Sequence, residues 1–69
     1  MFKVGDIVYS NEWGEGVVLT IHQDFLYPVV VEFDGEGVKT FTTRGKWRLD
    51  DPNTNKDITL TPKKENNDA

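Results

Sequence analysis

The chain has 69 residues, enough for one small domain with a single hydrophobic core. It contains no cysteine and one histidine, His22, so disulfides, thiolate metal sites and a zinc site built from histidines are excluded, and we expect neither a metal nor a cofactor. The net charge of −4 argues against binding of DNA or RNA through bulk electrostatics.

Five short runs rich in β-branched and aromatic residues predict an all-β protein, because no stretch has the apolar spacing of a helix. The segment DGEG, residues 34–37, predicts a tight hairpin turn, since glycine tolerates positive φ. In chain order, the expected strands cover residues 6–10, 16–22, 28–33, 38–43 and 58–61.

Side-chain alternation predicts which strand faces are buried. In the third strand we expect Val29, Val31 and Phe33 to be buried and Val30 and Glu32 to be more exposed. For the second strand the sequence does not decide which face is buried, because a bulge near its start would exchange the two faces. Either Val17, Leu19 and Ile21 point inward, or Val18 does.

Five short strands joined by hairpins predict a five-stranded barrel of SH3-like size, since an OB-fold usually needs a longer chain and a helix. Closing the sheet removes exposed edges, which helps a chain that has no disulfide. We expect the barrel to cover residues 1–62. The polar segment KKENNDA, residues 63–69, has no hydrophobic anchor and predicts a disordered tail.

The segment NEWGEGVVLTI, residues 11–21, raises the question of a phosphate-binding loop. A dinucleotide fingerprint needs a third glycine where this chain has Leu19, and it needs a following helix; no Walker lysine follows either. We therefore expect Gly14 and Gly16 to lie between two strands, where they let the chain turn and let one strand pass close to its neighbour.

Hydropathy predicts no membrane segment. No apolar run approaches 18 residues, and the first ten residues have no hydrophobic stretch of the signal-peptide kind. Together with the absence of cysteine, this favours a cytoplasmic protein.

Three patterns within residues 2–42 resemble a known group of small barrels. They are Gly5-Asp6-x-Val8, Trp13-Gly14-x-Gly16-x-Val18, and Val31-x-Phe33-Asp34 before a glycine turn. The chain is similar here to the Tudor-like C-terminal domain of UvrD/PcrA-type helicases, to the RNA polymerase-interacting domain of CarD-type regulators and, more loosely, to KOW modules. The resemblance implies an SH3/Tudor-like fold that docks on RNA polymerase or nucleic acid without catalysis. Its size would fit a phage or mobile-element accessory protein.

Charge is unevenly distributed, and this singles out one segment. Residues 1–37 carry a net charge of −6, residues 38–49 carry +4, and residues 50–69 carry −2. Such local fields steer encounters with partners. In the basic segment, Arg44, Lys46 and Arg48 alternate around Trp47, so an extended chain would place the three bases on one face. They could contact phosphates while the indole stacks on a base or on a partner protein; the alternative is a solvated loop whose tryptophan closes the barrel.

The sequence also contains residues that could suggest an aromatic cage, a calcium loop or a catalytic site. Tyr9, Trp13, Phe25 and Tyr27 could form an aromatic cage for methylated lysine, but a protein-binding aromatic patch is the simpler expectation. The alternating Asp and Asn residues of DDPNTNKD, residues 50–57, suggest calcium, yet they lack the EF-hand glycine and glutamate, so an Asx-rich turn is expected. We predict no enzyme, because His22 has no nucleophile in a recognisable motif.

The sequence therefore predicts a non-catalytic module that docks on a protein partner, with RNA polymerase or another nucleic-acid-processing machine suggested by the resemblance. The expected contact residues are Trp13, Arg44, Lys46, Trp47 and Arg48. Two alternatives remain. One is direct nucleic-acid binding through residues 44–48; the other is an acidic inhibitor that occupies a basic groove of its target through residues 1–37.

Overall fold

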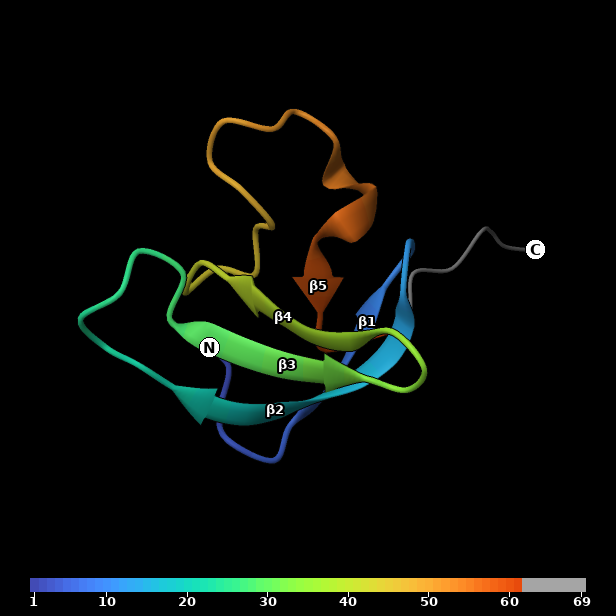
Figure 1. Cartoon of the computed structure of the whole chain (residues 1–69), viewed down its shortest axis with the longest axis horizontal. Helices are drawn as coiled ribbons and strands as arrows, with labels where there is room; N and C mark the ends of the chain where they lie inside the picture. The colour runs from blue at the N-terminus through green and yellow to red at the C-terminus, as the bar shows by residue number, and fades with distance from the viewer. Residues whose placement is uncertain (62–69) are drawn as a thin grey trace.

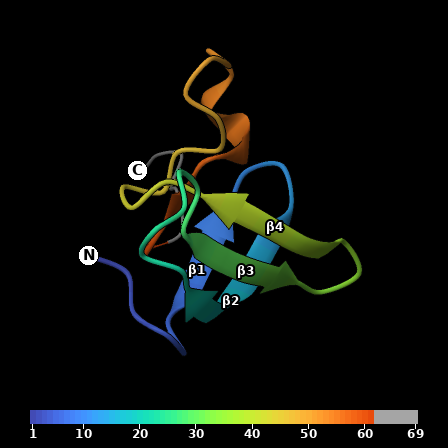
Figure 2. The ribbon, with the colours of Figure 1, turned by 60° about the vertical axis from the view of Figure 1, so that its left-hand side comes forward.

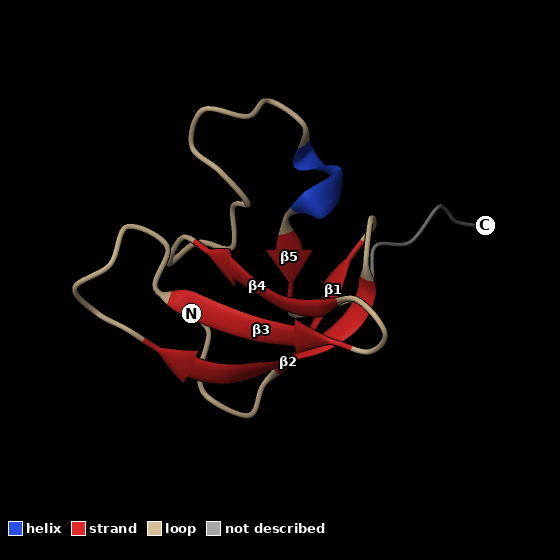
Figure 3. Cartoon of the chain, in the orientation of Figure 1, coloured by secondary structure: helices blue, strands red, loops and turns tan. Residues whose placement is uncertain are grey.

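The computed structural model describes residues 1–61, which form an all-β domain as predicted (Figures 1 and 3). Five antiparallel strands make one sheet in the order β4-β3-β2-β1-β5, and the sheet curls into a half-barrel (Figure 2). The strands are β1 (Ile7–Ser10), β2 (Gly14–Ile21), β3 (Val29–Phe33), β4 (Gly37–Phe41) and β5 (Ile58–Thr59), and a 3-10 turn, η1 (Thr54–Lys56), precedes β5.

The prediction of five strands is confirmed, but several bounds differ: β4 ends at Phe41 and β5 at Thr59, earlier than expected, and β2 begins earlier than expected. The turn after β1 is made by residues 11–13, and β2 already begins at Gly14, which pairs with Ser10. Placing both glycines between the strands was therefore wrong. Gly14 adopts a φ of 81°, which only a residue without a side chain takes easily, so the chain can leave the turn and pair at once.

The predicted faces of β3 are confirmed. Val29, Val31 and Phe33 are buried, whereas Glu32 is exposed and Val30 is half-buried. These three residues form one core cluster with four further buried side chains, Val8, Val18, Phe41 and Ile58. The core therefore draws on every strand, which compensates for the shortness of each.

The two registers left open for β2 are decided by a bulge. Val18 is 1% exposed, and Leu19 is 42% exposed on the opposite face. The pairing of β2 with β3 shifts between Val18 and Thr20, so that Ile21, beyond the shift, still packs against the core. The irregularity lies near the end of β2 and not near Gly16, the position considered for a bulge when the register was left open.

Gly16 lets β2 and β3 approach closely, as predicted. It is buried inside β2 and pairs with Val8 on one side and Phe33 on the other. A Cβ atom at this position would lie 2.7 Å from a ring carbon of Phe33 and 2.7 Å from a methyl carbon of Val31. The second glycine of the motif is therefore required by core packing.

The sheet does not close through a ladder between β4 and β5, which are its two ends. The chain between them bridges the gap instead (Figure 1). The N–H of Thr42 donates to the carbonyl of Lys46 (2.9 Å), and the N–H of Ile58 donates to the carbonyl of Gly45 (2.9 Å). Gly45 has a φ of 88°, and an added Cβ would lie 2.6 Å from the Ile58 carbonyl oxygen, so only glycine fits this crossing.

None of the described residues belongs to a helix with the length and apolarity that a membrane span requires. The predicted tail, residues 63–69, lies outside the part of the chain that the structure describes.

Candidate functional site: an aromatic and cationic cluster

Trp13 follows β1 in the turn of residues 11–13, and its side chain packs against the core. The buried hydroxyl of Ser10 accepts hydrogen bonds from the N–H groups of Glu12 (3.1 Å) and Trp13 (3.2 Å), and it donates to the carbonyl of Asn55 (3.2 Å). Glu12 N–H also donates to the Asn55 carbonyl (2.9 Å). One buried serine thus joins the first turn to η1 and fixes the backbone of the tryptophan.

Trp47 meets Trp13 edge to face, with ring centroids 4.8 Å apart and an interplanar angle of 72°. Its backbone N–H donates to the Asp57 carboxylate (2.8 Å), which fixes the segment after β4 against the residue before β5. Both indoles pack on the ring of Phe41. Because each tryptophan is only half-buried, the pair forms the outer layer of the core and also part of the surface.

Arg48 is clamped by aromatic rings. Its guanidinium carbon lies 3.8 Å from the centroid of a Trp47 ring and 4.3 Å from that of Tyr27. Its Nη1 donates to the carbonyls of Thr40 (2.9 Å) and Trp47. Thr40 belongs to β4, the end strand of the sheet, so this bond lets Arg48 cover part of the edge of that strand. These contacts give Arg48 a structural role, whatever else it contacts.

Two lysines complete the cluster. Lys39 Nζ lies 4.9 Å from the centroid of a Trp13 ring, while Lys56 Nζ lies 5.9 Å from Trp13 and 5.7 Å from Trp47. Cations at such distances are attracted by the negative faces of the rings. Lys39 pairs with the buried Val31 and therefore lies on the inner face of β4, where a charge also discourages edge-to-edge pairing of sheets. We call Trp13, Trp47, Lys39, Arg48 and Lys56 the tryptophan–cation cluster.

The predicted basic segment does not form an extended strand. Gly45 turns the chain, and the three bases have different surroundings. Arg44 is exposed, Lys46 Nζ donates to the carbonyl of Asp51 (3.2 Å), and Arg48 lies between two rings. The structure thus brings Trp13, Trp47 and Arg48 together and leaves Arg44 and Lys46 outside these ring contacts.

Lys39, Lys56 and Tyr27 also contribute to the site, although they were not among the predicted contact residues. The hydroxyl of Tyr27 accepts a hydrogen bond from the N–H of Leu49 (3.0 Å), which ties the loop after β2 to the basic segment. For Lys39 a signal was present: strand alternation places it on the same face as Phe41. Lys56 gave no comparable signal, because its position depends on η1.

The structure also places the residues considered for an aromatic cage and for a calcium loop. Of the four residues considered for a cage, Phe25 lies beside His22, with ring centroids 5.2 Å apart, and the Trp13 ring has the chain's own Lys39 over it. The Asx-rich turn is present: Asp51 accepts from Asn53 N–H (2.9 Å), and Asn53 accepts from Asn55 N–H (2.9 Å). Within residues 1–61 no group of three or more acidic or histidine side chains is arranged to hold a metal ion.

No protein-family model, curated protein or solved structure matches this chain.

Proposed function

We propose that this domain is a non-catalytic binding module, an SH3/Tudor-like barrel that docks on a protein partner through the tryptophan–cation cluster. The observation that carries the proposal is the pair of half-exposed indoles at 4.8 Å, with two lysine ammonium groups over their rings. Tryptophan and arginine are the residues most enriched among interface hot spots.

The rigidity of the cluster supports docking. Ser10 and Asp57 hold the backbone of the two tryptophans, and Tyr27 holds Arg48. A surface fixed before binding loses little side-chain entropy when it meets its partner. The resemblance of residues 2–42 makes RNA polymerase the first partner to test.

Direct nucleic-acid binding is the second candidate, and exposed Arg44 together with Lys39 and Lys56 favours it. Stacking of a base on Trp47 would compete with Arg48, which already lies 3.8 Å from the centre of a Trp47 ring. The net charge of −4 also opposes phosphate binding. We therefore place protein docking first.

Binding to immobilised RNA polymerase, measured by interferometry, tests the proposal. Trp47→Phe keeps an aromatic ring on Phe41 and should weaken binding by about tenfold, since it trims a hot-spot side chain. The double variant Lys39→Glu with Lys56→Glu should also weaken it, whereas Lys3→Glu, exposed before β1, should not. A thermal melt of each variant verifies folding.

A single-stranded and a duplex oligonucleotide provide the comparison at physiological salt. Submicromolar binding to either one, lost when Arg44, Lys39 and Lys56 are neutralised, would replace protein docking by the nucleic-acid alternative. Absence of binding to RNA polymerase would exclude the polymerase as the partner.

A further inference from the structure

The outer face of the sheet carries a row of aliphatic side chains that the proposed function does not use. Ile7, Val17, Glu32 and Val38 are direct neighbours across β1, β2, β3 and β4. Ile7 is 44% exposed and Val38 is 55% exposed. The solvent-facing side of an antiparallel sheet is normally polar, so three aliphatic residues in one row of four mark an unpartnered surface.

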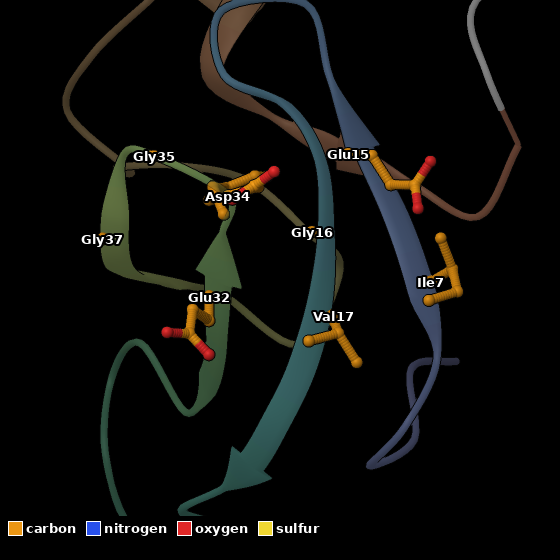
Figure 4. Close-up of a pocket in the computed structure, with 9 residues that line it drawn as sticks. Ile7, Glu15, Gly16, Val17, Glu32, Asp34, Gly35 and Gly37 are labelled. Atoms are coloured by element: carbon orange, nitrogen blue, oxygen red, sulfur yellow. The ribbon is translucent and has the colours of Figure 1, made fainter.

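The surface is hollowed beside this row. Figure 4 shows Ile7 and Val17 on adjacent strands. The carboxylates of Glu15 and Asp34 lie toward one end of the hollow, and Glu32 lies beside Val17 on β3. Glycines occupy three of the other lining positions, Gly16, Gly35 and Gly37, so no side chain fills the space. We call this feature the outer hollow.

We propose that the outer hollow is a docking site for a cationic segment of a partner protein that carries an aliphatic side chain between lysines or arginines. The aliphatic side chain would cover Ile7 and Val17, and the flanking bases would face Glu15, Glu32 and Asp34. Charge complementarity selects this occupant: residues 1–37 contain seven acidic residues, and Lys3 is their only base.

The composition of the hollow disfavours other ligands. Its carboxylates repel phosphates, and its aliphatic centre offers nothing to a bare cation. The described residues also contain no metal-binding group of acidic side chains, here or elsewhere. An aliphatic side chain flanked by positive charges can contact both the aliphatic side chains and the carboxylates of the hollow.

The hollow and the tryptophan–cation cluster belong to opposite faces of the sheet. Val17 and Glu32 alternate with the buried Gly16 and Phe33, whereas Lys39 of the cluster lies on the inner face. The domain could therefore hold two partners of opposite charge at once. The proposal for the outer hollow stands or falls independently of the proposed function.

Titration of the ¹⁵N-labelled domain with two blocked pentapeptides, KVKVK and KSKSK, tests the proposal. KVKVK should move the amide signals of Ile7, Val17 and Val38 and leave the indole N–H signals of Trp13 and Trp47 in place. KSKSK has the same charge without the aliphatic anchor, so it should bind at least about threefold more weakly, given about 0.8 kcal/mol for each buried methylene.

Two sets of variants locate the contacts. Glu15→Gln with Glu32→Gln should weaken KVKVK binding by about twofold to fivefold for each lost carboxylate, the range of exposed ion pairs. Ile7→Thr should weaken it too while keeping a β-branched residue in β1. The matched controls, Asp24→Asn and Leu49→Thr, change exposed residues that do not line the hollow and should bind as the wild type does.

Three outcomes would overturn the proposal. The first is the absence of shifts at several millimolar KVKVK; the second is equal affinity for KSKSK. The third is self-association of the free domain that Lys39→Glu abolishes. The occupant of the hollow would then be the tryptophan–cation cluster of a second copy. If Ile7→Thr fails to fold, the double glutamine variant still tests whether the carboxylates of the hollow contact KVKVK.

Discussion

Replacing Gly16 by alanine should destabilise the domain more than any other single added methyl group in β2. The new Cβ would lie 2.7 Å from Phe33 Cδ1, 2.7 Å from Val31 Cγ1 and 2.9 Å from the carbonyl oxygen of Glu32. Overpacking of this kind typically costs about 1–3 kcal/mol, and three simultaneous contacts, one with backbone, place Gly16→Ala near the upper end. A chain of this size has a total stability of roughly 3–10 kcal/mol.

Urea and thermal unfolding, followed by the fluorescence of Trp13 and Trp47, measure the effect. A loss of about 2–3 kcal/mol should lower Tm by roughly 8–24 °C in a domain of this length. Gly14→Ala is the matched control: a Cβ there meets nothing within 4 Å, and its cost comes from a φ of 81°. Gly14→Asn should recover part of that cost, since asparagine tolerates this conformation, whereas Gly16→Asn should be worse than Gly16→Ala.

A double-mutant cycle identifies the clash. Val31→Ala removes one of the methyl carbons that the new Cβ would meet, so Gly16→Ala should cost less in that background. The coupling should be about 0.5–3 kcal/mol, as for residues in direct contact. If Gly16→Ala melts with the wild type, or if the cycle shows no coupling, the close approach of β2 and β3 is not what requires glycine.

Four further predictions concern packing. Phe33→Ala should cost about 3–5 kcal/mol by denaturant titration, because the ring is only 1% exposed, and a melt like that of the wild type would contradict its place in the core. Ser10→Ala should cost about 1–3 kcal/mol, because it leaves the Trp13 N–H without its acceptor, while the Glu12 N–H keeps the carbonyl of Asn55; a neutral result would show that water replaces the hydroxyl. Arg48→Lys should lose about 0.5–2 kcal/mol with the ring stacking, while Arg44→Lys, at an exposed position, should be neutral in the same assay. Deletion of residues 63–69 should leave Tm nearly unchanged, since that segment has no apolar side chain larger than alanine; a drop of many degrees would refute this.

Local patterns were sufficient for the existence of the five strands and for the buried face of β3. Alternation in β3 predicted its buried face, because a side-chain period of two leaves only two choices and the valines and phenylalanine fall on one of them. Turn chemistry likewise predicted the hairpin at residues 34–37 and the Asx-rich turn before β5, since these depend on neighbours in the chain.

Only the tertiary structure decided the register of β2 and the composition of the site. The shift between Val18 and Thr20 depends on pairing with β3, which no local pattern contains. In the same way, Arg48 was predicted as one of three similar bases, but Tyr27, 21 positions earlier in the chain, places it between two rings. Lys56 reaches the tryptophans because η1 folds back toward the turn after β1. Sequence determined which segments are strands, because that choice is local; long-range packing determined which side chains meet, because contacts between distant segments form only when the sheet curls.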